Sequence, residues 1–127
     1  MPGPEAKRII DIGAVSSDAS LNICLDTLAR GKQALVFCNT KRGAESQAER
    51  TAHAIETNDP ALQALAEEVQ NVLATPTKQC KRLALCISKG VAFHHAGLHA
   101  KQRELIENKF REGVIKIICS TPTLPWG

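Results

Sequence analysis

Three short segments each follow an apolar run and carry groups that could bind an anion. We call them the Asn39 turn (residues 39–43, NTKRG), the His95 turn (residues 94–97, HHAG) and the Thr121 turn (residues 120–123, STPT). Thr40 and Thr121 stand where a helix could begin, and a helix start offers unpaired N–H groups and partial positive charge. Such a start is a ready phosphate site, and Lys41 and Arg42 add full charges. Alternatively, both threonines are ordinary helix N-caps, each worth roughly 1 kcal/mol.

Three histidines, His94, His95 and His99, could instead suggest a metal site, because His95 and His99 are four residues apart. Gly97 interrupts the group, however, and neither a carboxylate nor a cysteine stands nearby at metal-ligand spacing. We therefore predict no metal ligands. We expect one ring to pack in the edge of a sheet and the other to donate to the main chain or to a phosphate.

The sequence lacks the common nucleotide-binding and catalytic motifs. Residues 30–33 (RGKQ) contain the Gly-Lys of a phosphate-binding P-loop, but Asp26 occupies the position of its first glycine and Gln33 that of its Ser or Thr. The chain contains no GxGxxG, no GxSxG and no DExD or DExH pair. The sequence therefore predicts no catalytic residue.

The elements that position the three turns follow from the apolar pattern and its breakers. Continuous apolar runs predict strands at 8–15, 33–38, 90–93 and 114–119. Helical spacing predicts a first helix that is capped within residues 16–18 and ended by Gly31. It predicts further helices over 44–57, over 61–73 after an Asp59 cap and Pro60, from after residues 75–77 to about Ile87, and over 100–112. Strands alternating with helices predict an α/β fold, with a parallel sheet covered by helices on both faces.

The helix at 100–112 has an apolar stripe and a charged remainder. Leu105, Ile106 and Phe110 should face inward. The residues left to face water or a partner are Lys101, Arg103, Glu104, Glu107, Lys109 and Arg111. If the strands are parallel, the three turns share one edge of the sheet, where ligands of such folds bind. Together they predict a track for a phosphate backbone.

The amino-acid composition limits the kinds of ligand and partner that this chain could bind. The chain has 127 residues, which suits one domain, and its 3% aromatic content disfavours binding by base stacking. Residues 45–68 hold six acids and one base, whereas residues 78–116 hold nine bases and three acids. A basic half suits a polyanion, although it could equally be a solvated face. Five cysteines without a CxxC pair predict a reducing compartment, with Cys38 and Cys119 buried. Without a long apolar stretch, we expect a cytoplasmic protein and no membrane partner.

A family resemblance rests on three stretches and the segment between them. Residues 33–52 (QALVFCNTKRGAESQAERTA), 90–110 (GVAFHHAGLHAKQRELIENKF) and 117–127 (IICSTPTLPWG) resemble motifs IV, IVa and V of superfamily-two DExH-box helicases. More narrowly, they resemble the superkiller-like branch and its archaeal DNA helicases of the Hjm type. Residues 75–88 (TPTKQCKRLALCIS) also resemble the helical segment before HHAGL in that group.

The resemblance implies that residues 1–127 are part of a second RecA-like helicase domain, ending within motif V. The residues that it places on the nucleic-acid backbone are Asn39, Thr40, Lys41, Arg42, His95, Ala96, Gly97, Thr121, Pro122 and Thr123. It places Gly127 at the nucleotide. The intact enzyme would use ATP and Mg²⁺ to move 3′-to-5′ on single-stranded or forked DNA, with its first RecA-like domain as a partner.

The chain departs from the family where motif V should continue. Pro125 and Trp126 stand where the family continues with Ala and a Gly-Val-Asn-Leu-Pro run, and the P-loop, DExH box and arginine-finger motif are missing. We expect this chain alone to need no cofactor, to leave ATP unhydrolysed and to expose a sheet edge that favours self-association. The alternatives are an RNA helicase domain of the same branch, or a non-catalytic module that binds nucleic acid or protein. A Rossmann-type metabolite-binding domain is a third and weaker alternative, because its glycine fingerprint is missing.

Overall fold

A computed structural model describes residues 7–11 and 17–122, and these ranges contain four strands and five helices. The strands are β1 (Lys7–Asp11), β2 (Gln33–Phe37), β3 (Val91–His94) and β4 (Ile117–Ser120). The helices are α1 (Ser17–Ala29), α2 (Lys41–His53), α3 (Pro60–Gln70), α4 (Lys78–Ile87) and α5 (Ala100–Arg111). The strands and helices alternate along most of the chain, with α2, α3 and α4 in succession between β2 and β3.

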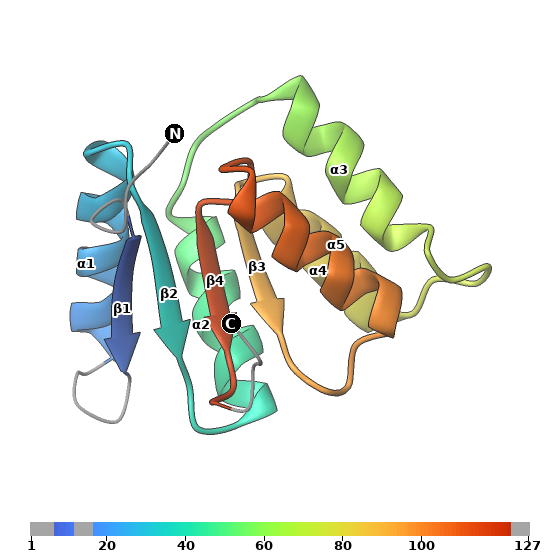
Figure 1. Cartoon of the computed structure of the whole chain (residues 1–127), viewed down its shortest axis with the longest axis horizontal. Coiled ribbons are helices and arrows are strands. Elements are labelled where there is room, and N and C mark those ends of the chain that lie inside the picture. Colours follow the sequence, from blue (N-terminus) through green and yellow to red (C-terminus); the bar gives the residue numbers. More distant parts are fainter. Residues whose placement is uncertain (1–6, 12–16, 123–127) are drawn as a thin grey trace.

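The four described strands form one parallel sheet in the order β1-β2-β4-β3. All four arrowheads point the same way in Figure 1. The fold is therefore α/β with a parallel sheet, as predicted for part of a RecA-like helicase domain. Because β2, β4 and β3 are neighbours, the turns that follow them meet at the carboxyl edge of the sheet.

Helices cover both faces of the sheet, which confirms the predicted layers. In Figure 1, α2 passes behind the strands and α5 lies in front of β3. Right-handed crossovers explain this, because the chain moves outward from β2 to β3 and then back to β4. The described side chains of β3 and β4 are all buried, as expected for parallel strands covered on both sides.

Capping residues set several helix boundaries. Asp59 caps α3 with Pro60 at its first position, and Gly31 and Gly113 take φ values of +70° and +83° where α1 and α5 end. The predicted start of α2 was wrong by several residues, and so were the predicted ends of α2 and α3. Helix α2 begins at Lys41 because the Thr40 side chain caps it, and it ends at His53 instead of Thr57.

β1 covers Lys7–Asp11, and residues 12–15 of the predicted strand lie outside the described residues. All five cysteines are free and buried, which confirms the burial of Cys38 and Cys119. Their compartment stays a prediction. None of the helices in the described ranges has the length and apolar character needed to span a bilayer.

Candidate nucleic-acid interface

Main-chain hydrogen bonds bring the three turns side by side at the carboxyl edge. The N–H of Cys38 donates to the carbonyl of Ser120 at 2.7 Å, which joins the Asn39 turn to the Thr121 turn. The N–H of Thr121 donates to the carbonyl of His94 at 3.3 Å, which joins the Thr121 turn to the His95 turn. The Thr121 turn thus lies between the other two, and the three form one continuous polar border.

The Asn39 turn presents two cations at the start of α2. The Thr40 hydroxyl accepts a hydrogen bond from the Gly43 N–H at 2.9 Å. Thr40 is therefore the N-cap of α2, as the alternative interpretation of this residue predicted. Asn39, Thr40, Lys41 and Arg42 are all exposed, and the first turn of α2 contains no acidic residue. Cations near the positive end of a helix dipole are unfavourable. Lys41 and Arg42 therefore do not stabilise α2, and an anion at this position would be attracted to both.

The His95 turn is shaped by a buried imidazole. The His95 side chain is 1% exposed and stacks on Phe93 with ring centroids 5.8 Å apart. Its Nδ1 accepts a hydrogen bond from the Gly97 N–H at 3.0 Å, so Nε2 carries the proton and donates to Glu45 at 2.7 Å. The sequence did not assign which histidine packs at the edge of the sheet and which donates; the His95 ring is buried, and its proton goes to the Glu45 carboxylate. Ala96 and Gly97 are exposed, so this turn offers a ligand its main chain.

Glu45 joins the His95 turn to two helices. Its carboxylate also accepts hydrogen bonds from Gln79 at 3.1 Å and Arg82 at 2.8 Å, and Arg82 extends to Glu49 on the next turn of α2. Burial raises the pKa of Glu45, but the hydrogen bonds from His95 and Gln79 and the charge of Arg82 outweigh it and hold this pKa below its usual value. The ionised carboxylate therefore fixes the His95 turn against α2 and α4.

The other two histidines have separate partners. The buried His94 ring pairs with Glu107 of α5 at 2.8 Å, and burial holds the pKa of His94 below its usual value. His99 caps α5, where its Nδ1 accepts a hydrogen bond from the Lys101 N–H at 3.1 Å. In the described part of the chain, no three His, Cys, Asp or Glu residues are grouped so that they could hold a metal ion.

The Thr121 turn is only partly within the described residues. Thr121 is half-buried and Pro122 is exposed, and the Ser120 hydroxyl donates to the Thr121 carbonyl at 2.9 Å. Thr123 and Gly127, which the sequence assigned to the phosphate backbone and to the nucleotide, lie outside the described residues. The prediction that a helix begins at Thr121 also falls on residues outside the described ranges.

Sequence reasoning missed Glu45, Gln79, Arg82 and Glu107. Glu45 lies 50 residues before His95 and 37 before Arg82, and only the folded chain brings them together. In the sequence, Glu45 is one acid in an acidic run and Arg82 one base in a basic run. No local motif marks either residue, so no signal in the sequence alone could have paired them.

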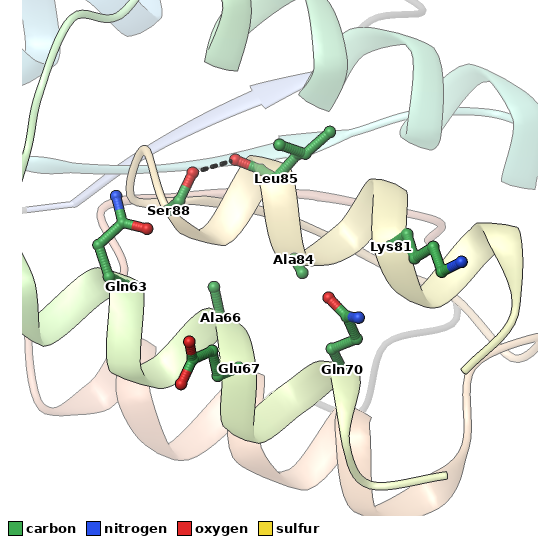
Figure 2. Close-up of a pocket in the computed structure, with 8 residues that line it drawn as sticks. All are labelled: Gln63, Ala66, Glu67, Gln70, Lys81, Ala84, Leu85 and Ser88. Carbon is green, nitrogen blue, oxygen red and sulfur yellow. Dashed lines mark hydrogen bonds between the residues drawn. The ribbon is translucent and has the colours of Figure 1, made fainter. Parts of the chain in front are cut away.

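The described surface also has a hollow away from this edge. It lies between α3 and α4 and has a volume of about 360 Å³ (Figure 2). Its lining residues are Gln63, Ala66, Glu67, Gln70, Lys81, Ala84, Leu85 and Ser88. None of the predicted binding residues lines it, and the Ser88 hydroxyl is turned to the Leu85 carbonyl at 2.6 Å. The carboxyl edge therefore remains the candidate site.

Comparison with known proteins points to one kind of enzyme. The chain is 43% identical over 120 residues to the ATP-dependent DNA helicase Hel308 of Methanocaldococcus jannaschii, which covers 92% of this chain and 10% of that protein. It is 39% identical over 128 residues to the protein of the same name from Methanococcus vannielii, covering 97% of this chain and 17% of that protein. With the Methanocella arvoryzae protein of this name it shares 42% identity over 109 residues.

These relatives are much longer than the matching segment. The chain spans between 9% and 17% of the length of these three proteins and of a fourth Hel308 protein, from Thermococcus kodakarensis, although they cover 81% to 97% of the chain. No protein-family model matches it. The similarity is thus to one segment of an ATP-dependent DNA helicase.

Proposed function

We propose that this chain is part of the second RecA-like domain of an ATP-dependent DNA helicase, and that its three turns bind the phosphate backbone of single-stranded DNA. The observation that carries the proposal is the continuous border of the three turns, joined by the Cys38–Ser120 and Thr121–His94 hydrogen bonds. The relatives named as DNA helicases match 92% and 97% of the chain, which supports DNA as the polyanion.

Each turn contributes a different kind of group to this proposed track. The Asn39 turn supplies the exposed Asn39 and Thr40 and the charges of Lys41 and Arg42. The His95 turn supplies the exposed main chain of Ala96 and Gly97, and the hydrogen bond from the Gly97 N–H to the His95 ring holds this turn in place. The Thr121 turn supplies Thr121, Pro122 and Thr123. Contacts to phosphate carry no base sequence, which suits an enzyme that steps along any strand.

The ATP hydrolysis and the movement along DNA belong to the intact enzyme. We propose that this enzyme couples hydrolysis of ATP, with Mg²⁺, to 3′-to-5′ movement on single-stranded or forked DNA. Gly127 and its surroundings then form part of one wall of the ATP cleft, opposite the first RecA-like domain. The proposal assigns no ATP-hydrolysing group and no Mg²⁺ ligand to the described residues, so we expect this chain alone not to hydrolyse ATP. The cytoplasmic location stays a prediction.

The first test is binding of this chain to a fluorescent single-stranded DNA, measured by anisotropy from low to moderate salt. The double variant Lys41→Ala, Thr121→Ala should bind several-fold more weakly. Its plot of log affinity against log salt should be shallower by about 0.7, since one phosphate contact is lost. The matched control is Lys32→Ala, Thr57→Ala, which removes the same groups from the opposite edge of the sheet and should bind like the parent chain.

Two outcomes would contradict the proposal. One is no binding at low salt by a sample whose far-ultraviolet circular dichroism shows the folded chain. The other is equal weakening by both double variants, which would mean that the carboxyl edge is not special. The same titration with RNA of equal sequence separates the alternatives within the branch, because a DNA helicase segment should not prefer the strand with 2′-hydroxyl groups.

A further inference from the structure

The His95 turn leads directly into a short buried segment that ends at the start of α5. Leu98 is 4% exposed, and its N–H donates to the His95 carbonyl at 3.1 Å. His99 then caps α5. Glu45 holds the first end of this segment through the His95 ring. The exposed main chain in the middle of the segment keeps one shape only if the second end, at His99, is held as well.

Gln102 holds that second end. It is 1% exposed, and its Oε1 accepts a hydrogen bond from the His99 N–H at 3.2 Å. Its Nε2 donates to the Val69 carbonyl, near the end of α3, at 3.1 Å and lies 3.4 Å from Sγ of Cys80, near the start of α4. The amide can face only one way, because the His99 N–H needs an oxygen and the Val69 carbonyl needs an N–H. One buried amide therefore joins the start of α5 to α3 and α4.

A fixed main chain matters in the His95 turn because of what this turn offers a ligand. Ala96 and Gly97 have no polar side chain, so any contact that they make with a strand comes from their exposed main chain. A loop that must be ordered on binding loses affinity, whereas a loop that is already ordered does not. Contacts at His95 and at His99 together keep the exposed part of the turn ordered before a ligand arrives.

A second buried glutamine makes the same kind of contact at the other end of α5. Gln33 is 3% exposed, and its Nε2 donates to the carbonyls of Phe110 at 2.6 Å and Ile115 at 2.9 Å. Gln33 begins β2, so this contact lies at the edge of the sheet opposite to the three turns. The two glutamines hold the two ends of one helix, and Gln102 is the one that adjoins the His95 turn.

We propose that Gln102 is a positioning residue, which holds the His95 turn in the shape that binds the DNA strand. The proposal rests on the proposed function, because it needs this turn to contact the strand. Gln102 makes no contact with DNA itself. It acts through the His99 N–H and through the main chain that runs from His99 back to His95.

The test compares this chain with its Gln102→Met and Gln33→Met variants. Methionine is unbranched and fills the space of glutamine without its amide, so both variants should have a lower melting temperature. At a temperature where all three chains are folded, Gln102→Met should bind the fluorescent single-stranded DNA about fivefold more weakly, since the turn must then be ordered on binding. Its salt slope should equal that of the parent chain, because no cation is lost. Gln33→Met should bind like the parent chain.

Amide hydrogen exchange, followed by NMR, reports the turn itself. The Gly97 N–H donates to Nδ1 of His95 at 3.0 Å. Its exchange is compared with that of Ile118 in β4, a strand paired on both sides, which reports opening of the whole sheet. Relative to Ile118, Gly97 should exchange faster in Gln102→Met than in the parent chain or in Gln33→Met. A purely structural Gln102 would leave this ratio unchanged.

Two results would overturn the Gln102 proposal alone. One is weakening of DNA binding by Lys41→Ala, Thr121→Ala without weakening by Gln102→Met. The other is equal weakening by Gln102→Met and Gln33→Met. A parent chain that is folded and does not bind DNA would overturn both proposals. Should Gln102→Met not fold, the same comparison uses Gln102→Asn and Gln33→Asn, whose shorter amide keeps a polar group in each site without reaching all its partners.

Discussion

At the scale of single residues, the His95 turn depends on the close approach of Gly97 to an imidazole. A Cβ on Gly97 would lie 2.9 Å from Cε1 and 3.0 Å from Nδ1 of His95. The ring cannot easily retreat, because Phe93 stacks on it and Glu45 holds its other nitrogen. Glycine is needed here for the space that a side chain would occupy.

Gly97→Ala should therefore lower the free energy of unfolding by about 1–3 kcal/mol, as overpacking in a filled site does. Urea denaturation measures this directly. Ala96→Ser, which changes the exposed neighbour in the same turn, is the control and should be close to neutral. Equal stability of Gly97→Ala and the parent chain would show that the ring is free to move.

At the scale of elements, the Glu45 carboxylate connects α2, α4 and the His95 turn. Two of the acids that make residues 45–68 acidic, Glu45 and Glu49, pair with Arg82 of α4. The acidic and basic halves of the sequence are thus partly matched in space. The pKa of Glu45 is lowered, so the folded state favours its charged form and gains stability from it above the usual carboxyl range.

Glu45→Gln should cost about 1–3 kcal/mol of unfolding free energy at pH 7, because the amide N–H₂ group would face the donors of Arg82 or Gln79. The unfolded chain binds a proton at Glu45 more readily than the folded chain does. The difference between parent and variant should therefore hold from pH 7 to about 5 and shrink as the pH falls below about 4.5. Urea unfolding at pH 7, 5, 4 and 3 measures it, with the exposed Glu104→Gln as control. A difference that does not depend on pH would argue against the charged network.

At the scale of the whole molecule, β1 and β3 are the two edges of the described sheet. Ile9 of β1 is 71% exposed, and an edge strand with an exposed apolar side chain favours pairing with another chain along its outer side. Leu85 of α4 is equally exposed, at 72%, but it lies on a helix whose main chain is already paired. The two residues thus separate strand pairing from simple apolar contact.

We expect the chain to self-associate with increasing concentration, and Ile9→Lys to shift this association to higher concentration. Sedimentation velocity over a concentration series measures the shift. Leu85→Lys adds the same charge on α4 and should have a smaller effect. The prediction fails if the parent chain stays monomeric throughout, or if Leu85→Lys is the variant that suppresses association.

The sequence by itself determined the order and type of the elements and the positions of the three turns. These depend on local features, such as the apolar run of β2, the Thr40 and Asp59 caps and the glycine at 113. The helix ends were less predictable, because caps and packing decide them within a few residues.

Only the tertiary structure decided the partners across the sheet and between helices. It set the strand order that places the Thr121 turn between the other two, and it buried His95 against a carboxylate 50 residues away. It also buried the Nε of Arg103 without a hydrogen-bond partner among the described residues. The reason is physical: local patterns fix which face of an element is apolar, but long-range polar pairs form only once those faces have packed.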